Sequence, residues 1–250
     1  MNRKAAFRVR VLGCGDAFAS GGRFQTAFLL EIGEGRLLVD CGATTLVALQ
    51  RAGIDPSTID AVLISHLHGD HVGGLPFLLL DQHFRGERRR PLALIGPPGI
   101  GERQRDLMRV CFPGSDAMAL RFPLETEELA PGKPHRSGEA EIAAIEVDHP
   151  SGAPSLGLRI RADGRILAYS GDTQWTDSLV ELADGADLFI CECYAYEPGV
   201  SNHMNYRALL EKRSRLRAKR IVLTHLSSDM LARRESLEIE VLDDGMVINL

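Results

Sequence analysis

Short apolar runs alternate with segments of helical period along most of the chain. Residues 26–42, TAFLLEIGEGRLLVDCG, predict a hairpin of two apolar strands joined by a Gly-Glu-Gly turn. A helix from 44 to 52 and a strand at 60–64 are expected next, and Pro76 fits the first turn of a helix at 75–84. This alternation predicts βα units and an α/β fold class.

The second half of the sequence repeats this pattern. The predicted strands cover residues 141–147, 156–161, 165–169, 187–193 and 220–224, and a terminal hairpin is expected to turn at Asp243-Asp244-Gly245. Residues 85–135 are rich in Gly, Pro and Arg and contain no motif. Because no linker or low-complexity stretch separates the halves, we expect one domain over residues 1–250, with two β-rich layers and helices outside.

Composition excludes several classes of protein. The chain is 44% hydrophobic and 25% charged, as in ordinary soluble proteins. It has no apolar run of roughly 18 residues and no signal-peptide pattern in MNRKAAFRVRVLG, so we expect a cytoplasmic protein without a membrane partner. Five scattered cysteines form no CxxC pair. The net charge of −5 disfavours a generally basic nucleic-acid surface, and the basic runs 85–91 and 211–220 are interpreted as solvated faces.

Candidate metal ligands gather directly after one apolar strand. His66, His68, Asp70 and His71 fall within six positions. His66 and His68 are two apart in an extended segment, so they point the same way and can bind one metal. Gly69 lets the backbone turn, so that Asp70 and His71 face a second metal. This spacing predicts a dinuclear site.

Other apolar runs end in further candidate ligands, namely His149, Asp172 and His225. The ends of neighbouring strands meet at one edge of a sheet, which would bring these side chains together. We expect Asp172 to bridge two divalent ions, one bound by His66, His68 and His149 and the other by Asp70, His71 and His225. Nitrogen and oxygen ligands of this kind favour Zn²⁺, with Mn²⁺ and Fe²⁺ as alternatives.

The segment SHLHGDHVGGLP resembles the HxHxDH signature of the metallo-β-lactamase superfamily, and His149, Asp172 and His225 match its later metal motifs in order. The resemblance implies a four-layer αββα sandwich with a dinuclear site between the sheets. Relatives that reduce dioxygen carry Glu at the position of His68, so the motif implies hydrolysis. Four segments, HLHGDHVGGLP, ADLFICECYAYE, SNHMNYRALL and KRIVLTHLSS, resemble the phosphodiesterase branch, which holds ribonuclease Z and the phosphoribosyl cyclic phosphodiesterase of phosphonate breakdown.

This branch also implies catalytic residues. A histidine at the position of His203 serves near the leaving group, oriented by an acid at the position of Glu192, and Asp70 belongs to the metal motif. Ribonuclease Z carries a long tRNA-grasping arm where this chain has only residues 150–171, and the cysteine cluster of the phosphonate-pathway enzyme is reduced here to Cys14. Dimerisation is common among these relatives, so a homodimer is expected.

Two acidic residues outside the motifs have two interpretations each. Asp40, at the end of RLLVD, either accepts a hydrogen bond from a ligand imidazole or caps the strand before Gly42. Asp16, in GCGDAF, either lines the pocket or caps a turn.

Charge favours an anionic substrate. Two divalent ions, two aspartates and a bridging hydroxide leave a residual positive charge, which suits a phosphodiester attacked by that hydroxide. We therefore expect a hydrolase of small phosphodiesters, cyclic ones included, in which His203 protonates the leaving group. The alternatives are a hydrolase of a lactone, thioester or β-lactam, a ribonuclease Z-like enzyme that processes RNA 3′ ends, and a metal-holding scaffold without activity. Nucleic acid is the less favoured partner and stays open.

Overall fold

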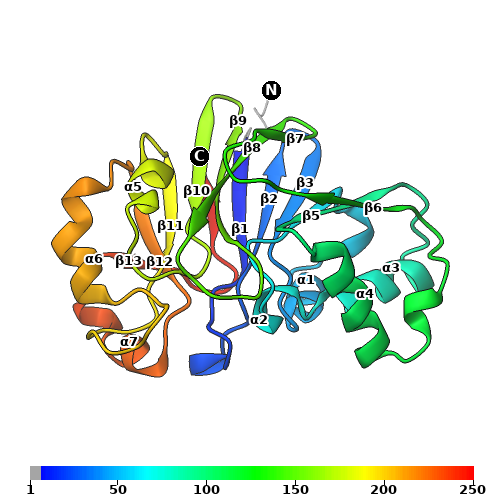
Figure 1. Cartoon of the computed structure of the whole chain (residues 1–250), viewed down its shortest axis with the longest axis horizontal. Helices are drawn as coiled ribbons and strands as arrows, with labels where there is room; N and C mark the ends of the chain where they lie inside the picture. Colours follow the sequence, from blue (N-terminus) through cyan, green and yellow to red (C-terminus); the bar gives the residue numbers. More distant parts are fainter. Residues whose placement is uncertain (1–6) are drawn as a thin grey trace.

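Two mixed β-sheets pack face to face in the computed structural model, which describes residues 7–250 (Figure 1). Helices cover the outer face of each sheet, which gives the four αββα layers expected from the sequence. The N-terminal segment MNRKAAFRVRVLG, in which the sequence shows no signal-peptide pattern, includes residues 1–6, and these lie outside the described residues.

The first sheet and its helices come mainly from the first half of the chain. The elements are β1 (Phe7–Gly13), η1 (Ser20–Gly22), β2 (Ala27–Ile32), β3 (Gly35–Val39), α1 (Thr45–Arg51), η2 (Pro56–Thr58), β4 (Ala61–Leu63), α2 (Gly69–Val72), α3 (Leu75–Phe84), β5 (Leu92–Gly96), α4 (Ile100–Cys111), η3 (Ser115–Ala117) and β6 (Leu124–Glu128). Residues 85–135, which contain no motif, thus supply β5, α4 and β6, and both strands extend the sheet in parallel.

The second sheet and its helices come from the rest of the chain. The elements are β7 (His135–Ser137), β8 (Ala140–Val147), β9 (Ser155–Ala162), β10 (Arg165–Tyr169), α5 (Ser178–Ala183), β11 (Leu188–Glu192), α6 (Tyr206–Lys212), η4 (Arg213–Arg215), β12 (Ile221–Thr224), α7 (Ser228–Ala232), η5 (Arg234–Ser236), β13 (Glu240–Val241) and β14 (Val247–Asn249). In Figure 1, α5, α6 and α7 flank this sheet, whereas α1, α3 and α4 flank the first.

The two sheets have the same plan. The first has the order β14-β1-β2-β3-β4-β5-β6 and the second β13-β12-β11-β10-β9-β8-β7. In each sheet one half is antiparallel, and the strands of the other half, β3 to β6 and β10 to β13, run parallel. The carboxyl ends of parallel strands are where α/β sheets place their functional loops. Each sheet therefore offers one such edge.

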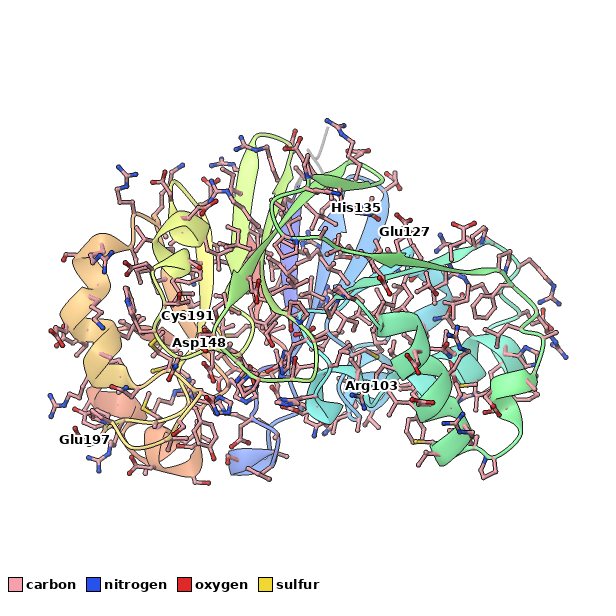
Figure 2. All side chains as sticks on the ribbon, in the orientation of Figure 1. Arg103, Glu127, His135, Asp148, Cys191 and Glu197 are labelled. Carbon is pink, nitrogen blue, oxygen red and sulfur yellow. The ribbon has the colours of Figure 1, made fainter. Side chains whose placement is uncertain are left out.

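Three apolar layers hold the sandwich together. One lies between the sheets, and the other two lie between each sheet and its helices. Strand β8 shows how the sequence specifies this, because Ile142 and Ala144 face the layer between the sheets while Ile145 packs on the helix side. The last strands of the two sheets, β6 and β7, also approach each other. His135 on β7 lies 3.5 Å from Glu127 on β6, so these two sheet edges meet (Figure 2).

The predicted terminal hairpin is wrong. The turn is present, because the Met246 amide donates to the Asp243 carbonyl and Gly245 has a φ of 86°. However, β13 pairs in parallel with β12 of the second sheet, whereas β14 pairs with β1 of the first. This crossover covers one exposed edge in each sheet and buries Ile248 between the sheets.

Two glycines let the loop after β3 pack against the segment that carries the HxHxDH motif. A Cβ on Gly42 would lie 2.2 Å from the Asp70 carbonyl oxygen, and one on Gly74 would lie 2.2 Å from the Gly42 carbonyl oxygen. Backbone hydrogen bonds join the same segments, from the Cys41 amide to the His71 carbonyl at 2.7 Å and from the Gly74 amide to the Cys41 carbonyl at 2.8 Å. Close backbone contacts with the loop after β3 therefore hold the HxHxDH motif in place.

Candidate metal centre

Strand ends from both sheets deliver the predicted ligands to one place. The HxHxDH motif follows β4, and its last two ligands lie on the single turn of α2. Loops after β8, β10 and β12 of the second sheet carry His149, Asp172 and His225. Figure 2 labels Asp148 and Cys191, the chain neighbours of His149 and Glu192, one below the other on the left of the view.

The structure brings the seven predicted ligands together in two groups, and within each group the candidate ligand atoms lie within 4.8 Å of one another. The groups are His66, His68 and His149, and Asp70, His71, Asp172 and His225. Asp172 adjoins both, because its Oδ2 lies 3.8 Å from His66 Nε2 and 3.3 Å from His225 Nε2. These are the two sets expected from the sequence, with Asp172 placed between them.

Three buried polar atoms at the centre lack a hydrogen-bond partner among the described residues. They are His66 Nε2, His71 Nε2 and Asp172 Oδ1. A buried, unpartnered nitrogen or oxygen costs about 1–3 kcal/mol, so three at one point need a common partner. Imidazole nitrogens and carboxylate oxygens are ligands for Zn²⁺, Mn²⁺ and Fe²⁺. The residues present therefore fit divalent metal ions.

Hydrogen bonds at the outer ring nitrogens orient the imidazoles. His71 Nδ1 donates to Asp40 Oδ2 at 2.8 Å, and His149 Nδ1 donates to the Asn202 carbonyl at 2.8 Å. His225 Nδ1 lies 3.3 Å from the Thr26 hydroxyl. In all three rings Nε2 is left for the centre, which is the arrangement that supporting groups impose on metal-binding histidines.

Asp40 is the hub of this supporting network. Besides His71 it accepts hydrogen bonds from the Ser65 amide at 2.8 Å, the Ser65 hydroxyl at 2.9 Å and the Tyr169 hydroxyl at 2.9 Å. It is fully buried, and its φ of 59° lies in the left-handed region, where Asp and Asn are tolerated. Of its two interpretations, the structure favours the hydrogen-bond acceptor for a ligand imidazole.

Replacing Asp40 with asparagine should weaken metal binding by about 10–100-fold, the usual cost of losing a supporting carboxylate. Asn keeps the backbone conformation but loses the charge and one acceptor, so His71 loses its fixed orientation. Competition with a metal chelator measures the affinity. Asp163→Asn is the matched control, because Asp163 has a φ of 47° on an exposed turn. Equal affinity in the two variants would contradict this role.

Charge pairing dominates the centre. Burial opposes ionisation of Asp70, but His71 lowers its pKa well below the usual range. Burial likewise opposes ionisation of Asp172, and His225 and His71 hold its pKa well below normal. Burial and the neighbouring His71 lower the pKa of His66. Burial opposes protonation of His71, but Asp172, Asp40 and Asp70 raise its pKa well above normal. The centre thus contains ionised carboxylates, the form that binds cations.

His203 lies beside the metal ligands with its outer nitrogen held. Its ring centroid is 4.8 Å from that of His149 and 5.7 Å from that of His225. His203 Nδ1 forms a hydrogen bond to Glu192 Oε1. Burial opposes protonation of His203, but this bond and the Glu192 charge raise its pKa. The side chain keeps 22% of its surface exposed, so its Nε2 is available to a substrate.

Glu192 is fully buried and its second oxygen is also satisfied. Glu192 Oε2 accepts from the Thr173 amide at 2.9 Å and the Met204 amide at 3.0 Å. Thr173 follows Asp172 directly, so Glu192 connects the loop of a candidate metal ligand to His203.

Of the two interpretations of Asp16, the structure favours the turn cap. The Asp16 carboxylate accepts hydrogen bonds from the amide and the hydroxyl of Ser20.

Tyr194 also lies at this site, although the sequence analysis did not single it out. Tyr194 places its ring 5.0 Å from His203 and 6.2 Å from His225, centroid to centroid. The only signal was its place directly after the strand end that holds Glu192. A tyrosine at a strand end is more often a packing residue, so sequence position alone does not single it out.

Comparisons with known proteins agree with this geometry. A family described as anti-Pycsar protein Apyc1 matches residues 7–244. The chain is 30% identical over 275 aligned residues to the ribonuclease Z of Anoxybacillus flavithermus, covering 87% of this chain and 86% of that protein.

Solved structures share the fold. The short form of human tRNase Z is 27% identical with a TM-score of 0.77, covering 96% of this chain and 98% of that one. The metallo-β-lactamase fold protein YhfI from Bacillus subtilis is 24% identical with a TM-score of 0.78, covering 98% of this chain and 99% of its own. The protein therefore belongs to the anti-Pycsar protein Apyc1 family and is a metal-dependent hydrolase of the metallo-β-lactamase fold, related to ribonuclease Z.

Proposed function

We propose that this protein is a dinuclear metal-dependent phosphodiesterase that hydrolyses small phosphodiesters, cyclic ones included. The observation that carries the proposal is the place of His203, which is partly exposed, paired with buried Glu192 and adjacent to two groups of candidate metal ligands. A hydrolase with a proton donor beside a cationic centre suits a substrate whose leaving oxygen becomes negatively charged.

The donor set supports two ions, with Zn²⁺ favoured and Mn²⁺ or Fe²⁺ as alternatives. When bound, such ions would supply a hydroxide near neutral pH and would offset the negative charge of the phosphate. His66, His68 and His149 would hold one ion, and Asp70, His71 and His225 the other. Asp172 would contact both.

The residues of this chain then supply the rest of the reaction. Asp40 holds His71, and Asn202 holds His149, so the ligands are oriented before a substrate arrives. Glu192 occupies Nδ1 of His203, which leaves Nε2 to protonate the leaving oxygen. The rings of two candidate ligands, His149 and His225, lie 4.8 and 5.7 Å from that of His203, so the phosphorus and the leaving oxygen would lie between His203 and the centre.

Parallel assays on the metal-loaded protein test the substrate class. We expect turnover of bis(p-nitrophenyl) phosphate and none of a homoserine lactone, an acyl thioester or a β-lactam. Turnover of one of those carboxylic substrates without diester hydrolysis would overturn the proposal and favour the first alternative. The Asp40→Asn variant should lose the diester activity in parallel with its metal content, which shows that the activity belongs to this centre.

Processing of RNA 3′ ends is a second candidate, favoured by the identity with ribonuclease Z. Two features weigh against it. Residues between His149 and Asp172 form only β9, β10 and short connections. In the basic segment 211–220, four of the cations pair with acids at 2.6–2.9 Å, namely Arg215 with Asp177, Arg217 with Asp184, Lys219 with Asp187 and Arg220 with Glu240.

Because acidic side chains lie beside those cations and reduce the local positive charge, we expect tRNA precursor to bind no tighter than about 10⁻⁵ M at physiological salt, the range of non-specific contacts. Filter binding at two salt concentrations measures this. Submicromolar binding that weakens steeply with salt, accompanied by 3′ cleavage, would establish the RNA function instead.

Among residues 7–250, the helices are too short or too polar to cross a bilayer. The cytoplasmic location and the homodimer expected from the sequence stay predictions, as does the single domain over residues 1–250.

A further inference from the structure

Tyr194 is an aromatic residue at the candidate site, and its hydroxyl has no hydrogen-bond partner among the described residues. The ring is half-buried and lies 5.0 Å from His203 at an interplanar angle of 35°. Within residues 7–250 the hydroxyl makes no hydrogen bond, and it is not among the buried unpartnered atoms. The ring therefore packs beside His203 and is partly exposed.

The backbone around Tyr194 is rigid. The Cys193 amide donates to the Thr224 carbonyl at 3.0 Å, and the Ser227 amide donates to the Tyr194 carbonyl at 3.1 Å. Ala195 and Asn205 form a bridge that closes the loop from 195 to 205, which carries His203. Tyr194 and His203 thus stand at the base of one closed loop, and their relative position is set before a substrate binds.

Tyr194 adjoins two residues of the catalytic arrangement. His203 contacts His149 on one side, while Tyr194 lies near His203 and His225. Burial and the Asp16 carboxylate raise the pKa of Tyr194, so the phenol is neutral. Two further apolar side chains are exposed on adjoining loops, Phe18 two residues after Asp16 with 79% exposure and Val200 between Tyr194 and His203.

We propose that Tyr194 is a specificity-determining residue whose ring contacts the leaving group, and that the enzyme prefers phosphodiesters whose leaving group carries a flat, unsaturated ring. The inference rests on the proposed function, because it uses His203 to locate the leaving oxygen. A group protonated by His203 departs beside Tyr194, so a partly exposed aromatic ring there selects for leaving groups that can stack on it.

Tyr196 provides a matched control two residues away. Its ring stacks on Tyr206 at 5.5 Å, and Arg207 and Arg233 lie 4.9 and 4.7 Å from its centroid. Tyr196 is therefore occupied by its own neighbours and has no contact with His203. Replacing either tyrosine with leucine removes a flat ring and keeps apolar volume.

Calorimetry on the metal-loaded protein, with phenyl phosphate and methyl phosphate as probes, tests the inference without turnover. We expect Tyr194→Leu to raise the dissociation constant of phenyl phosphate by about 3- to 10-fold and to leave that of methyl phosphate unchanged. Tyr194→Phe should restore phenyl phosphate binding, and Tyr196→Leu should change neither constant.

The outcomes separate this inference from the proposed function. If wild-type protein hydrolyses bis(p-nitrophenyl) phosphate but Tyr194→Leu binds both probes as wild type does, the inference fails and the function stands. An equal loss for both probes would also overturn it, because it would mean that Tyr194 only supports the centre. If the wild type hydrolyses no diester, the proposed function fails and the inference fails with it.

Discussion

Replacing Asp172 with asparagine should lower kcat/KM for bis(p-nitrophenyl) phosphate by about 10³-fold or more, beyond the 10–100-fold expected for a supporting residue. Asp172 is buried between the two ligand groups, with its Oδ2 within 3.3–3.8 Å of His225, His71 and His66. In the proposed centre two cations would share the negative charge of Asp172, which an amide cannot supply. Metal content should therefore fall together with activity, as elemental analysis and steady-state kinetics would measure.

Asp177→Asn is the control for this loop. Asp177 lies five residues on, its side chain is 77% exposed, and it pairs with Arg215 at 2.9 Å. Exposed pairs contribute little, so this variant should keep wild-type activity and metal content. If Asp172→Asn kept both metals and full turnover, Asp172 would have no place between them.

His203→Ala should produce a loss that depends on the leaving group. With methyl phenyl phosphate, whose phenolate leaves poorly, we expect kcat to fall by about 10²–10⁴-fold, the usual contribution of a general acid. With methyl p-nitrophenyl phosphate the leaving group needs little help from a proton, and the loss should be below about 10-fold. The ratio of the two losses, measured by phenol and nitrophenol release, isolates proton donation from other effects.

His135→Ala is the matched control for His203, because His135 also faces a glutamate, Glu127, but at the edge where β6 and β7 meet (Figure 2). This variant should hydrolyse both diesters at wild-type rates. Equal losses for the two leaving groups in His203→Ala would assign His203 to substrate placement and contradict its role as the acid.

Local sequence patterns predicted the parts of the site that depend on local geometry. The pair His66 and His68 could be assigned because alternate residues in an extended segment share a face. The α/β class followed from the alternation of short apolar runs with helical periods, and the four layers followed from the resemblance carried by the HxHxDH motif. Both are confirmed by the fold.

Features that depend on distant parts of the chain could not be predicted in the same way. The terminal strands join different sheets, because β12 and β1 each had a free edge that only the folded sandwich reveals. The supporting role of Asp40 depends on His71 and Tyr169, which lie 31 and 129 residues away along the chain. Tyr194 can be assigned to the site only because the folded structure places its ring beside that of His203.

The proposed dinuclear phosphodiesterase is tested most directly by elemental analysis of protein purified without chelator, combined with hydrolysis of bis(p-nitrophenyl) phosphate by the same sample. We predict close to two divalent ions per chain and diester turnover that disappears on chelation and returns when the metal is restored. Absence of bound metal even after reconstitution, or two ions per chain without any diester hydrolysis, would contradict the account.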